Sequence, residues 1–193
     1  MGTDQPSDAD GGATGAGVSE ELLDRIEAGK EHPPKPDFLT EEEWQDVIAA
    51  RSPTVIRLAG TGHADAYQAV GGEGLDETQG APVIVLTTVG RKTGNDVATC
   101  VNYLVDGEDL IVVGSFAGFG VSPHWVLNLE KTPHATVELR DRSWSVTARR
   151  ITGEERAALW PRLVEFFPLW EHFQRYCRRE FAVFVLSPET PDH

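Results

Sequence analysis

The sequence predicts a mainly β protein of the α+β class, built on a six-stranded antiparallel barrel with flanking helices. Six runs of β-branched and aliphatic residues are distributed over residues 83–186, and turn residues separate them. The chain has 193 residues, which fits one domain, and its 40% hydrophobic content includes five Trp and eight Phe for a core. Because the helical patterns are short, we expect the strands to form a small closed or split barrel.

Acidic residues are concentrated near the N-terminus. The first 50 positions hold 13 of the 31 Asp and Glu residues but three of the 17 Lys and Arg residues. Residues 1–18 contain almost no large apolar side chains, so we expect them to be disordered. We therefore divide the chain into an acidic, largely disordered segment, 1–36, and a barrel domain, 37–193. The net charge of −14 disfavours nucleic acid and anionic lipid as partners.

Three stretches precede the first strand. Apolar residues at helical spacing behind Ser19 predict a short helix over 19–29 that needs a partner to stay folded. A capping-box pattern opens a predicted helix over 40–51, which either covers one end of the barrel or forms a lid over a substrate cleft. Residues 55–75 contain five glycines, and we expect short pieces and a loop there.

The predicted strands are joined by Gly, Asn and Asp residues typical of hairpins. We expect them at about 83–88, 97–105, 109–114, 134–139, 144–151 and 181–186.

Two helical regions interrupt these strands. Ser122 as N-cap and Pro123 at the first helical position predict a short helix after the third strand. A second capping-box pattern begins at Thr152, where we expect a helix that Pro161 interrupts. Pro168 then starts another helix over 168–179.

Three motifs follow one another within residues 83–130. They read TTVGRKTG at 87–94, SFAG at 115–118 and PHWVLNL at 123–129. In the first, glycines allow backbone N–H groups to converge on an anion, and Arg91 and Lys92 add charge. Taken alone, this loop would be an ordinary hairpin with solvated basic residues. It is not a Walker loop, because the spacing differs and no helix follows it.

Together the three motifs resemble those of the split-barrel nitroreductases and quinone reductases that use the deazaflavin coenzyme F420. The resemblance covers roughly residues 55–188 and implies a split β-barrel of the FMN-binding type. It also implies an oxidoreductase that transfers a hydride from reduced coenzyme F420 to a small planar acceptor, such as a quinone, an enone or a nitroaromatic. Two alternatives stay open: a split-barrel reductase that binds FMN, and a carrier that binds a lipid or a deazaflavin without turnover.

The resemblance implies roles for individual residues. The coenzyme carries a phosphodiester and a polyglutamate tail, which we expect to be held by Arg91, Lys92, Thr93 and Gly94. The ring would be framed by Thr87, Thr88, Asn102, Ser115, Trp125 and Asn128. Ser115 is the expected catalytic residue, because its hydroxyl can bond the ring or substrate and help to deliver a proton. The acceptor pocket would be lined by Phe167, Trp170 and Phe173, which share one helix face.

Some positions depart from the family pattern. Val97 stands where the family commonly has Arg, which weakens the polyanion site by one charge, and compensation could come from Arg140, Arg142, Arg149 and Arg150. Cys100 stands where Pro is frequent, and Asn102 where a large hydrophobic residue is common. The three aromatic residues of the acceptor pocket replace tyrosines, which predicts a more apolar pocket. Core packing is the alternative role for these residues and for Trp125.

Other sequence features bound the setting. Cys100 and Cys177 have no CxxC spacing and no nearby His cluster, so we expect no metal site, and nothing requires an oxidising compartment. The apolar runs reach about six residues, far short of the roughly 20 that span a bilayer, and no secretory signal pattern is present. We expect a cytoplasmic protein without an integral membrane segment, and leave peripheral membrane contact and a homodimer open.

Overall fold

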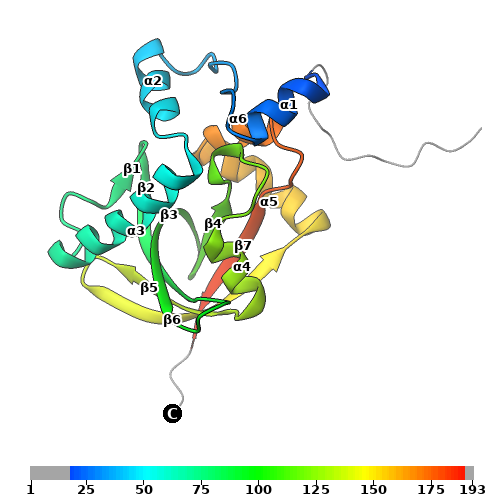
Figure 1. Ribbon diagram of the computed structural model, residues 1–193. Coiled ribbons are helices and arrows are strands. Elements are labelled where there is room, and N and C mark those ends of the chain that lie inside the picture. Colours follow the sequence, from blue (N-terminus) through cyan, green and yellow to red (C-terminus); the bar gives the residue numbers. More distant parts are fainter. Residues whose placement is uncertain (1–17, 190–193) are drawn as a thin grey trace, which may run out of the picture.

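Six antiparallel strands form a closed barrel, as the sequence predicts. The structure is a computed structural model that describes residues 18–189. The strands run in the order β2-β3-β4-β7-β6-β5, and β5 pairs back with β2 to close the ring, while the short β1 extends β2. The strands are β1 (Glu77–Thr78), β2 (Ala81–Val89), β3 (Asp96–Asp106), β4 (Asp109–Gly114), β5 (His134–Leu139), β6 (Arg142–Ile151) and β7 (Ala182–Pro188) (Figure 1).

Strand β2 is apolar without alternation because both of its faces are covered. Ile84 and Leu86 point into the barrel core, whereas Val83 and Val85 pack under a helix on the outside. All four side chains are fully buried. Burial of an aliphatic side chain stabilises a fold by about 1.5–3 kcal/mol, so this strand contributes strongly to both layers.

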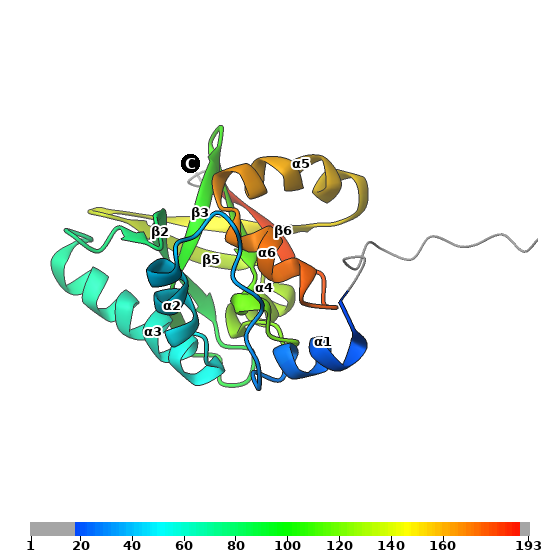
Figure 2. The same ribbon diagram turned by 90° about the horizontal axis from the view of Figure 1, so that it is seen from above.

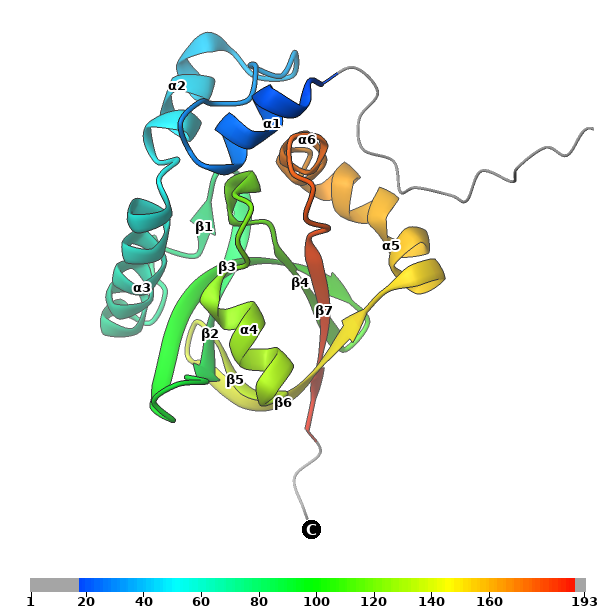
Figure 3. The ribbon, with the colours of Figure 1, turned by 45° about the vertical axis from the view of Figure 1, so that its right-hand side comes forward.

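The helices surround the barrel. They are α1 (Glu20–Glu27), α2 (Glu41–Ala49), α3 (Pro53–Val70), the short turn η1 (Phe116–Gly118), α4 (His124–Lys131), α5 (Gly153–Phe166) and α6 (Leu169–Arg175). Helices α3 and α5 lie on opposite sides of the barrel (Figure 2). The view in Figure 3 shows α4 across one mouth of the barrel, where its apolar residues join the barrel core.

Helix α3 corrects the prediction of short pieces over 55–75. It is one helix of 18 residues that contains Gly60 and Gly62. A Cβ at Gly60 would lie 3.1 Å from Cγ2 of Thr99, so the missing side chain lets α3 approach β3 closely. Ala64 and Tyr67 are buried on the same side. This tertiary packing offsets the roughly 1 kcal/mol that each glycine costs inside a helix.

The start of α4 also differs from the prediction. Pro123, not Ser122, occupies the N-cap position, with extended backbone angles, and no side chain caps the helix. Pro123 is buried and packs near Gly114 at the end of β4, which holds it in this conformation.

Two predictions for α5 are wrong. Pro161 lies inside the helix and does not interrupt it, because its ring is exposed while Leu163 anchors the following turn in the core. The capping box at Thr152 does not form. The carboxylate of Glu155 instead accepts two hydrogen bonds from Arg149, at 2.7 and 2.8 Å. The capping box of α2 and the Ser19 cap of α1 are confirmed.

Helix α1 finds the partner that its short length requires. Leu23 and Ile26 are buried, and α1 lies beside α6 in Figures 1 and 3. Arg178, just after α6, forms ion pairs with Glu20, Asp24 and Glu27 of α1. The segment from residue 18 therefore packs on the barrel domain. The division at residue 36 stays a prediction, and the disorder expected for residues 1–18 falls almost wholly outside the described residues.

Two general properties can be stated for residues 18–189. No helix there has the length and apolar character needed to cross a bilayer. No group of three or more His, Cys, Asp or Glu side chains in this range is arranged to hold a metal ion.

Candidate functional site

One large cavity lies beside strand β3. Its volume is about 810 Å³, and it is bounded by the N-terminal half of α3, the first part of β3, the loop after β4 and helix α6. Seven of the predicted site residues line it: Arg91, Asn102, Ser115, Trp125, Phe167, Trp170 and Phe173. The three motifs therefore converge on one cavity, although they are separated along the chain.

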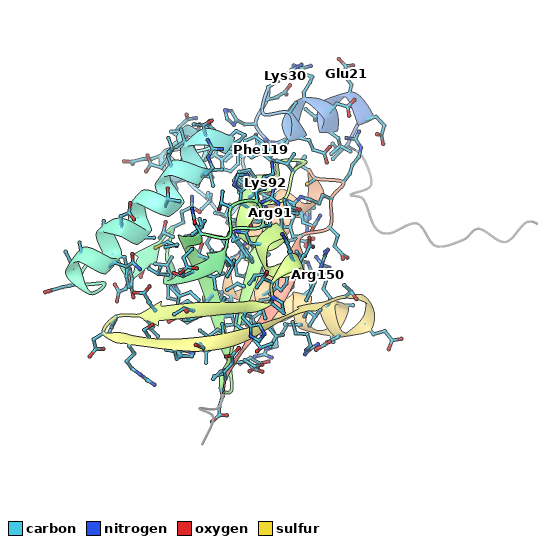
Figure 4. The ribbon with its side chains drawn as sticks, turned by 60° about the horizontal axis from the view of Figure 1, so that its bottom comes forward. Glu21, Lys30, Arg91, Lys92, Phe119 and Arg150 are labelled. Carbon is cyan, nitrogen blue, oxygen red and sulfur yellow. The ribbon has the colours of Figure 1, made fainter. Side chains whose placement is uncertain are left out.

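The remaining predicted residues are not part of the cavity wall: Thr87, Thr88, Lys92, Thr93, Gly94 and Asn128. Lys92, Thr93 and Gly94 are exposed on the loop between β2 and β3, next to Arg91. Figure 4 labels Arg91 and Lys92 as neighbouring side chains on this loop. Gly94 has a φ of 75°, a left-handed conformation that glycine adopts readily.

Thr88 and Asn128 hold this loop in place. Both are buried, at 1% and 3% exposure. The Asn128 side chain donates a hydrogen bond to Oγ1 of Thr88 at 3.0 Å and accepts one from the backbone N–H of Arg91 at 3.1 Å. Nζ of Lys131 donates to the Arg91 carbonyl at 2.7 Å. The loop backbone is thus anchored on α4, independently of the Arg91 and Lys92 side chains.

Four basic side chains form what we call the cation cluster: Arg57, Arg91, Lys92 and His124. Arg57 and His124 line the cavity with Arg91. The pKa of His124 lies below its ordinary value of 6.5, because of partial burial and the nearby charges of Arg91, Arg57 and Lys92. Within residues 18–189, no carboxylate forms an ion pair with any member of the cluster.

The arginines proposed from sequence to replace the charge absent at Val97 do not do so. Arg140 pairs with Asp76, Arg149 with Glu155 and Arg150 with Glu130. The guanidinium of Arg142 lies over the Trp144 ring, and none of the four arginines lines the cavity. The sequence analysis did not identify Arg57, because it predicted short pieces and a loop over residues 55–75 and no continuous helix. Helical spacing from Arg57 to Gly60 and Ala64 was the signal that could have found it.

The three predicted acceptor residues, Phe167, Trp170 and Phe173, form an aromatic wall on the α6 side of the cavity. They are buried in the outer core cluster and also line the cavity. The rings of Phe167 and Trp170 meet edge to face, with centroids 5.2 Å apart. Val47 and Ala50, at the end of α2, border the same cavity. Core packing and a binding surface are therefore compatible roles for these residues.

Arg51 is a buried residue of the site that the sequence did not reveal. Its side chain lines the cavity, yet the residue is 5% exposed. Its three guanidinium nitrogens donate hydrogen bonds of 2.9 Å to the carbonyls of Ala117, Glu31 and Ile26. Burial lowers the pKa of Arg51 to about 10, so it stays charged at neutral pH. Arg51 thereby connects α1 and the segment after it to the loop that follows β4.

This loop contains an uncommon backbone conformation. Phe116, Ala117 and Gly118 have φ values of 47°, 48° and 73°, so three consecutive residues are left-handed. Each non-glycine residue in that region costs about 1–2 kcal/mol. Arg179 offsets part of this strain by donating to the carbonyls of Gly114, Ser115 and Phe119, at 3.0, 2.9 and 3.2 Å. Arg51 and Arg179 thus hold the loop beside Ser115 from two directions.

Replacing Gly118 with alanine is expected to destabilise the protein by about 2 kcal/mol. A Cβ at Gly118 would lie 3.1 Å from the carbonyl oxygen of Phe173, in addition to the left-handed strain. Gly107→Ala is the matched control, because Gly107 also has a positive φ but has no atom within 4 Å of the added Cβ. Urea denaturation should show a larger loss for Gly118→Ala than for Gly107→Ala. Equal losses would contradict a close fit of η1 on α6.

Three polar side chains on the cavity wall differ in their availability. The Ser115 side chain is half-buried on the cavity wall and does not cap the η1 turn, so its hydroxyl can bond a ligand. The Asn102 amide nitrogen is committed to the carbonyls of Ala81 and Thr78, at 3.1 and 3.3 Å. Burial raises the pKa of the Cys100 thiol to about 12, so this group stays protonated at neutral pH and is no nucleophile.

Comparisons with known proteins agree on one family. Residues 61–188 match the family model described as F420H(2)-dependent quinone reductase. A Mycobacterium tuberculosis protein named as an F420H(2)-dependent quinone reductase is 30% identical over 101 residues, which is 51% of this chain and 68% of that protein. A second M. tuberculosis protein, which bears the same name provisionally, is 30% identical over 107 residues, 55% of this chain and 90% of that protein.

A solved structure gives the same picture. The structure of an F420-H2 dependent reductase is 28% identical, with a TM-score of 0.51, and the match covers 55% of this chain and 94% of that chain.

Proposed function

The chain belongs to the F420H(2)-dependent quinone reductase family, and we propose that it transfers a hydride from reduced coenzyme F420 to a quinone-type acceptor. One observation carries this proposal. A single cavity joins a cluster of cations without carboxylate partners in the described chain to a wall of buried aromatic side chains. The first fits a polyanionic cofactor and the second fits a flat, apolar acceptor.

The cation cluster suits the phosphodiester and carboxylates of the coenzyme. The cations of the cluster repel one another, and no carboxylate among the described residues neutralises them although the chain has a net charge of −14. A bound polyanion would relieve this repulsion. Arg91 and Lys92 would hold the phosphate, with Thr93 and the glycine backbone at Gly94 beside them. Thr88 and Asn128 would act indirectly by positioning the Arg91 backbone. The ring would lie against Ser115, Asn102 and Trp125.

The chemistry divides between coenzyme and protein. Reduced F420 supplies the hydride when it is bound, and the protein supplies binding, orientation and exclusion of water. The Ser115 hydroxyl is free to donate a hydrogen bond to the acceptor oxygen and to pass on a proton. The aromatic wall would stack the acceptor and keep water away from it. Because this wall has no hydroxyl groups, it favours quinones over acceptors that need polar contacts.

Titration of the full-length protein with F420 and with FMN, followed by ligand fluorescence at low and high salt, tests the cofactor. We expect F420 to bind more tightly and salt to weaken its binding. Oxidation of the bound, reduced coenzyme by a soluble quinone then tests the reaction, with a nitroaromatic and an enone compared beside it. Binding of FMN alone would overturn the cofactor assignment. Tight F420 binding without oxidation by any acceptor would indicate a carrier.

Binding of F420 is expected to strengthen as the pH falls from about 8 to about 5.5, by roughly three- to tenfold. Partial burial and then the neighbouring cations lower the pKa of His124 in the free protein, and a bound polyanion would raise it again. Protonated His124 therefore favours the complex, and the gain levels off once the residue is protonated in both states. Comparing Kd values of wild type and His124→Gln at each pH removes ionisations of the coenzyme itself. Parallel pH profiles would refute the role of His124.

A homodimer and a cytoplasmic location stay predictions. Size-exclusion chromatography with light scattering would test the first of them directly.

A further inference from the structure

Helix α3 brings a cation to the cavity that no motif indicates. Arg57 and Gly60 are three residues apart and therefore lie on the same helix face. Gly60 lies against Thr99 of β3, which fixes the distance between α3 and the strand. Arg57, one turn earlier, lines the cavity together with Arg91, Val97 and His124. The close helix packing thus sets the position of the Arg57 side chain relative to the loop after β2.

The charges around Arg57 indicate what it can bind. Its charge acts on His124 together with those of Arg91 and Lys92, so the four groups lie within electrostatic reach of one another. Eight other arginines of the described chain each form an ion pair with Asp or Glu, whereas Arg57 does not. An arginine left without a carboxylate in so acidic a chain, facing other cations across a cavity, is well placed to receive an anion.

Val97 explains why a charge from α3 is needed. This valine lines the same part of the cavity, at the start of β3 and next to Gly90. Its apolar side chain leaves the β3 wall without a cation opposite the loop. A third permanent charge can come from across the cavity, where Arg57 lies, because the guanidinium of Arg51 is already bonded to three backbone carbonyls.

We propose that Arg57 is a phosphate- or carboxylate-binding residue that completes the anion site from α3. This inference rests on the proposed function, because the anion it would receive is the charged tail of coenzyme F420. Arg57 would close the anion site opposite Arg91, and the tail would lie between α3 and the β2–β3 loop. It would bind the tail and not the ring, so it would affect affinity and salt dependence before it affects turnover.

Three variants of the full chain test the proposal, with F420 titrated at about pH 8, where His124 is neutral. Arg57→Gln is expected to weaken F420 binding about tenfold and to reduce its salt dependence. Arg142→Gln removes the same charge outside the cavity and should leave both unchanged. Adding Val97→Arg to Arg57→Gln should restore most of the affinity, because position 97 faces the same anion from β3. Arg57 is exposed and Gln is a good helix former, so all variants should fold.

The probes identify which part of the ligand Arg57 contacts. A deazaflavin riboside without phosphate or glutamates should bind wild type and Arg57→Gln equally well. A coenzyme with the phosphodiester but no glutamates separates phosphate binding from carboxylate binding. We expect Arg57→Gln to lose affinity through one of these two groups. Unchanged F420 affinity in Arg57→Gln, an equal loss for the riboside, or failure of Val97→Arg to restore binding would each overturn the inference. If wild type binds no F420 at either salt concentration, the proposed function itself fails.

Discussion

Replacing Arg51 with methionine is expected to lower the free energy of unfolding by about 2–4 kcal/mol and to weaken cofactor binding at least tenfold. Methionine keeps an unbranched apolar stem but is shorter, and it removes the donors to the carbonyls of Ala117, Glu31 and Ile26. Methionine also avoids the cost of burying a charged guanidinium, which offsets part of the lost stability. The expected loss is therefore smaller than the sum for three separate hydrogen bonds. Without Arg51, the left-handed residues beside Ser115 lose one of their two supports.

Urea denaturation, monitored by circular dichroism, measures the change in stability. Titration followed by F420 fluorescence measures the change in binding, without urea and at a temperature where both proteins are folded. Arg162→Met is the matched control, because Arg162 forms an exposed ion pair with Asp106. Such pairs contribute about 0–1 kcal/mol, so this variant should resemble wild type. Arg51→Lys keeps the charge but cannot reach three separate carbonyls, and it should fall between the two. Normal stability of Arg51→Met would show that the loop does not depend on this contact.

The contrast between Arg91 and Arg51 shows how far sequence reasoning reaches. Arg91 lies in a motif of consecutive residues whose glycines and charges suggest an anion site locally. Arg51 bonds to Ala117, which is 66 positions away, and nothing near Arg51 in the sequence indicates that contact. Arg179 is a similar case, since it donates to the carbonyls of Gly114 and Ser115, which are 65 and 64 positions away. Local patterns can locate a loop, but they cannot identify the side chains that reach it from other elements.

The same limit applies to the fold: features set by local patterns were predictable, and features set by tertiary contacts were not. The strand runs were predictable because a strand such as β2, covered on both faces, must be continuously apolar. Helix α3 was not predictable from local propensity, since its glycines are unfavourable until Gly60 packs on Thr99. Pro161 is a second example, because α5 continues through it and the burial of Leu163 helps to offset the cost of a proline inside a helix. In both cases a tertiary contact outweighed a local preference of about 1–3 kcal/mol.

The double variant Arg91→Ala/Lys92→Ala is expected to weaken F420 binding about 100-fold and to remove most of its dependence on salt. Each side chain would supply one charge-assisted contact to the polyanion. The variant should fold normally, because the loop backbone is held by Asn128 and Lys131 and not by the two side chains that are removed. Fluorescence titration at low and high salt gives both quantities in one experiment.

A second variant separates the effect of the two charges on F420 binding from the effect of the loop's position. Asn128→Ala keeps both cations but removes the acceptor for the Arg91 N–H and the donor to Thr88, so it should weaken F420 binding while leaving the salt dependence near that of wild type. Arg142→Ala/Lys30→Ala removes two charges outside the cavity and controls for net charge. Equal binding by Arg91→Ala/Lys92→Ala and this control would mean that the tail lies elsewhere. A loss in affinity with an unchanged salt dependence would mean that the loop shapes the cavity without neutralising the ligand.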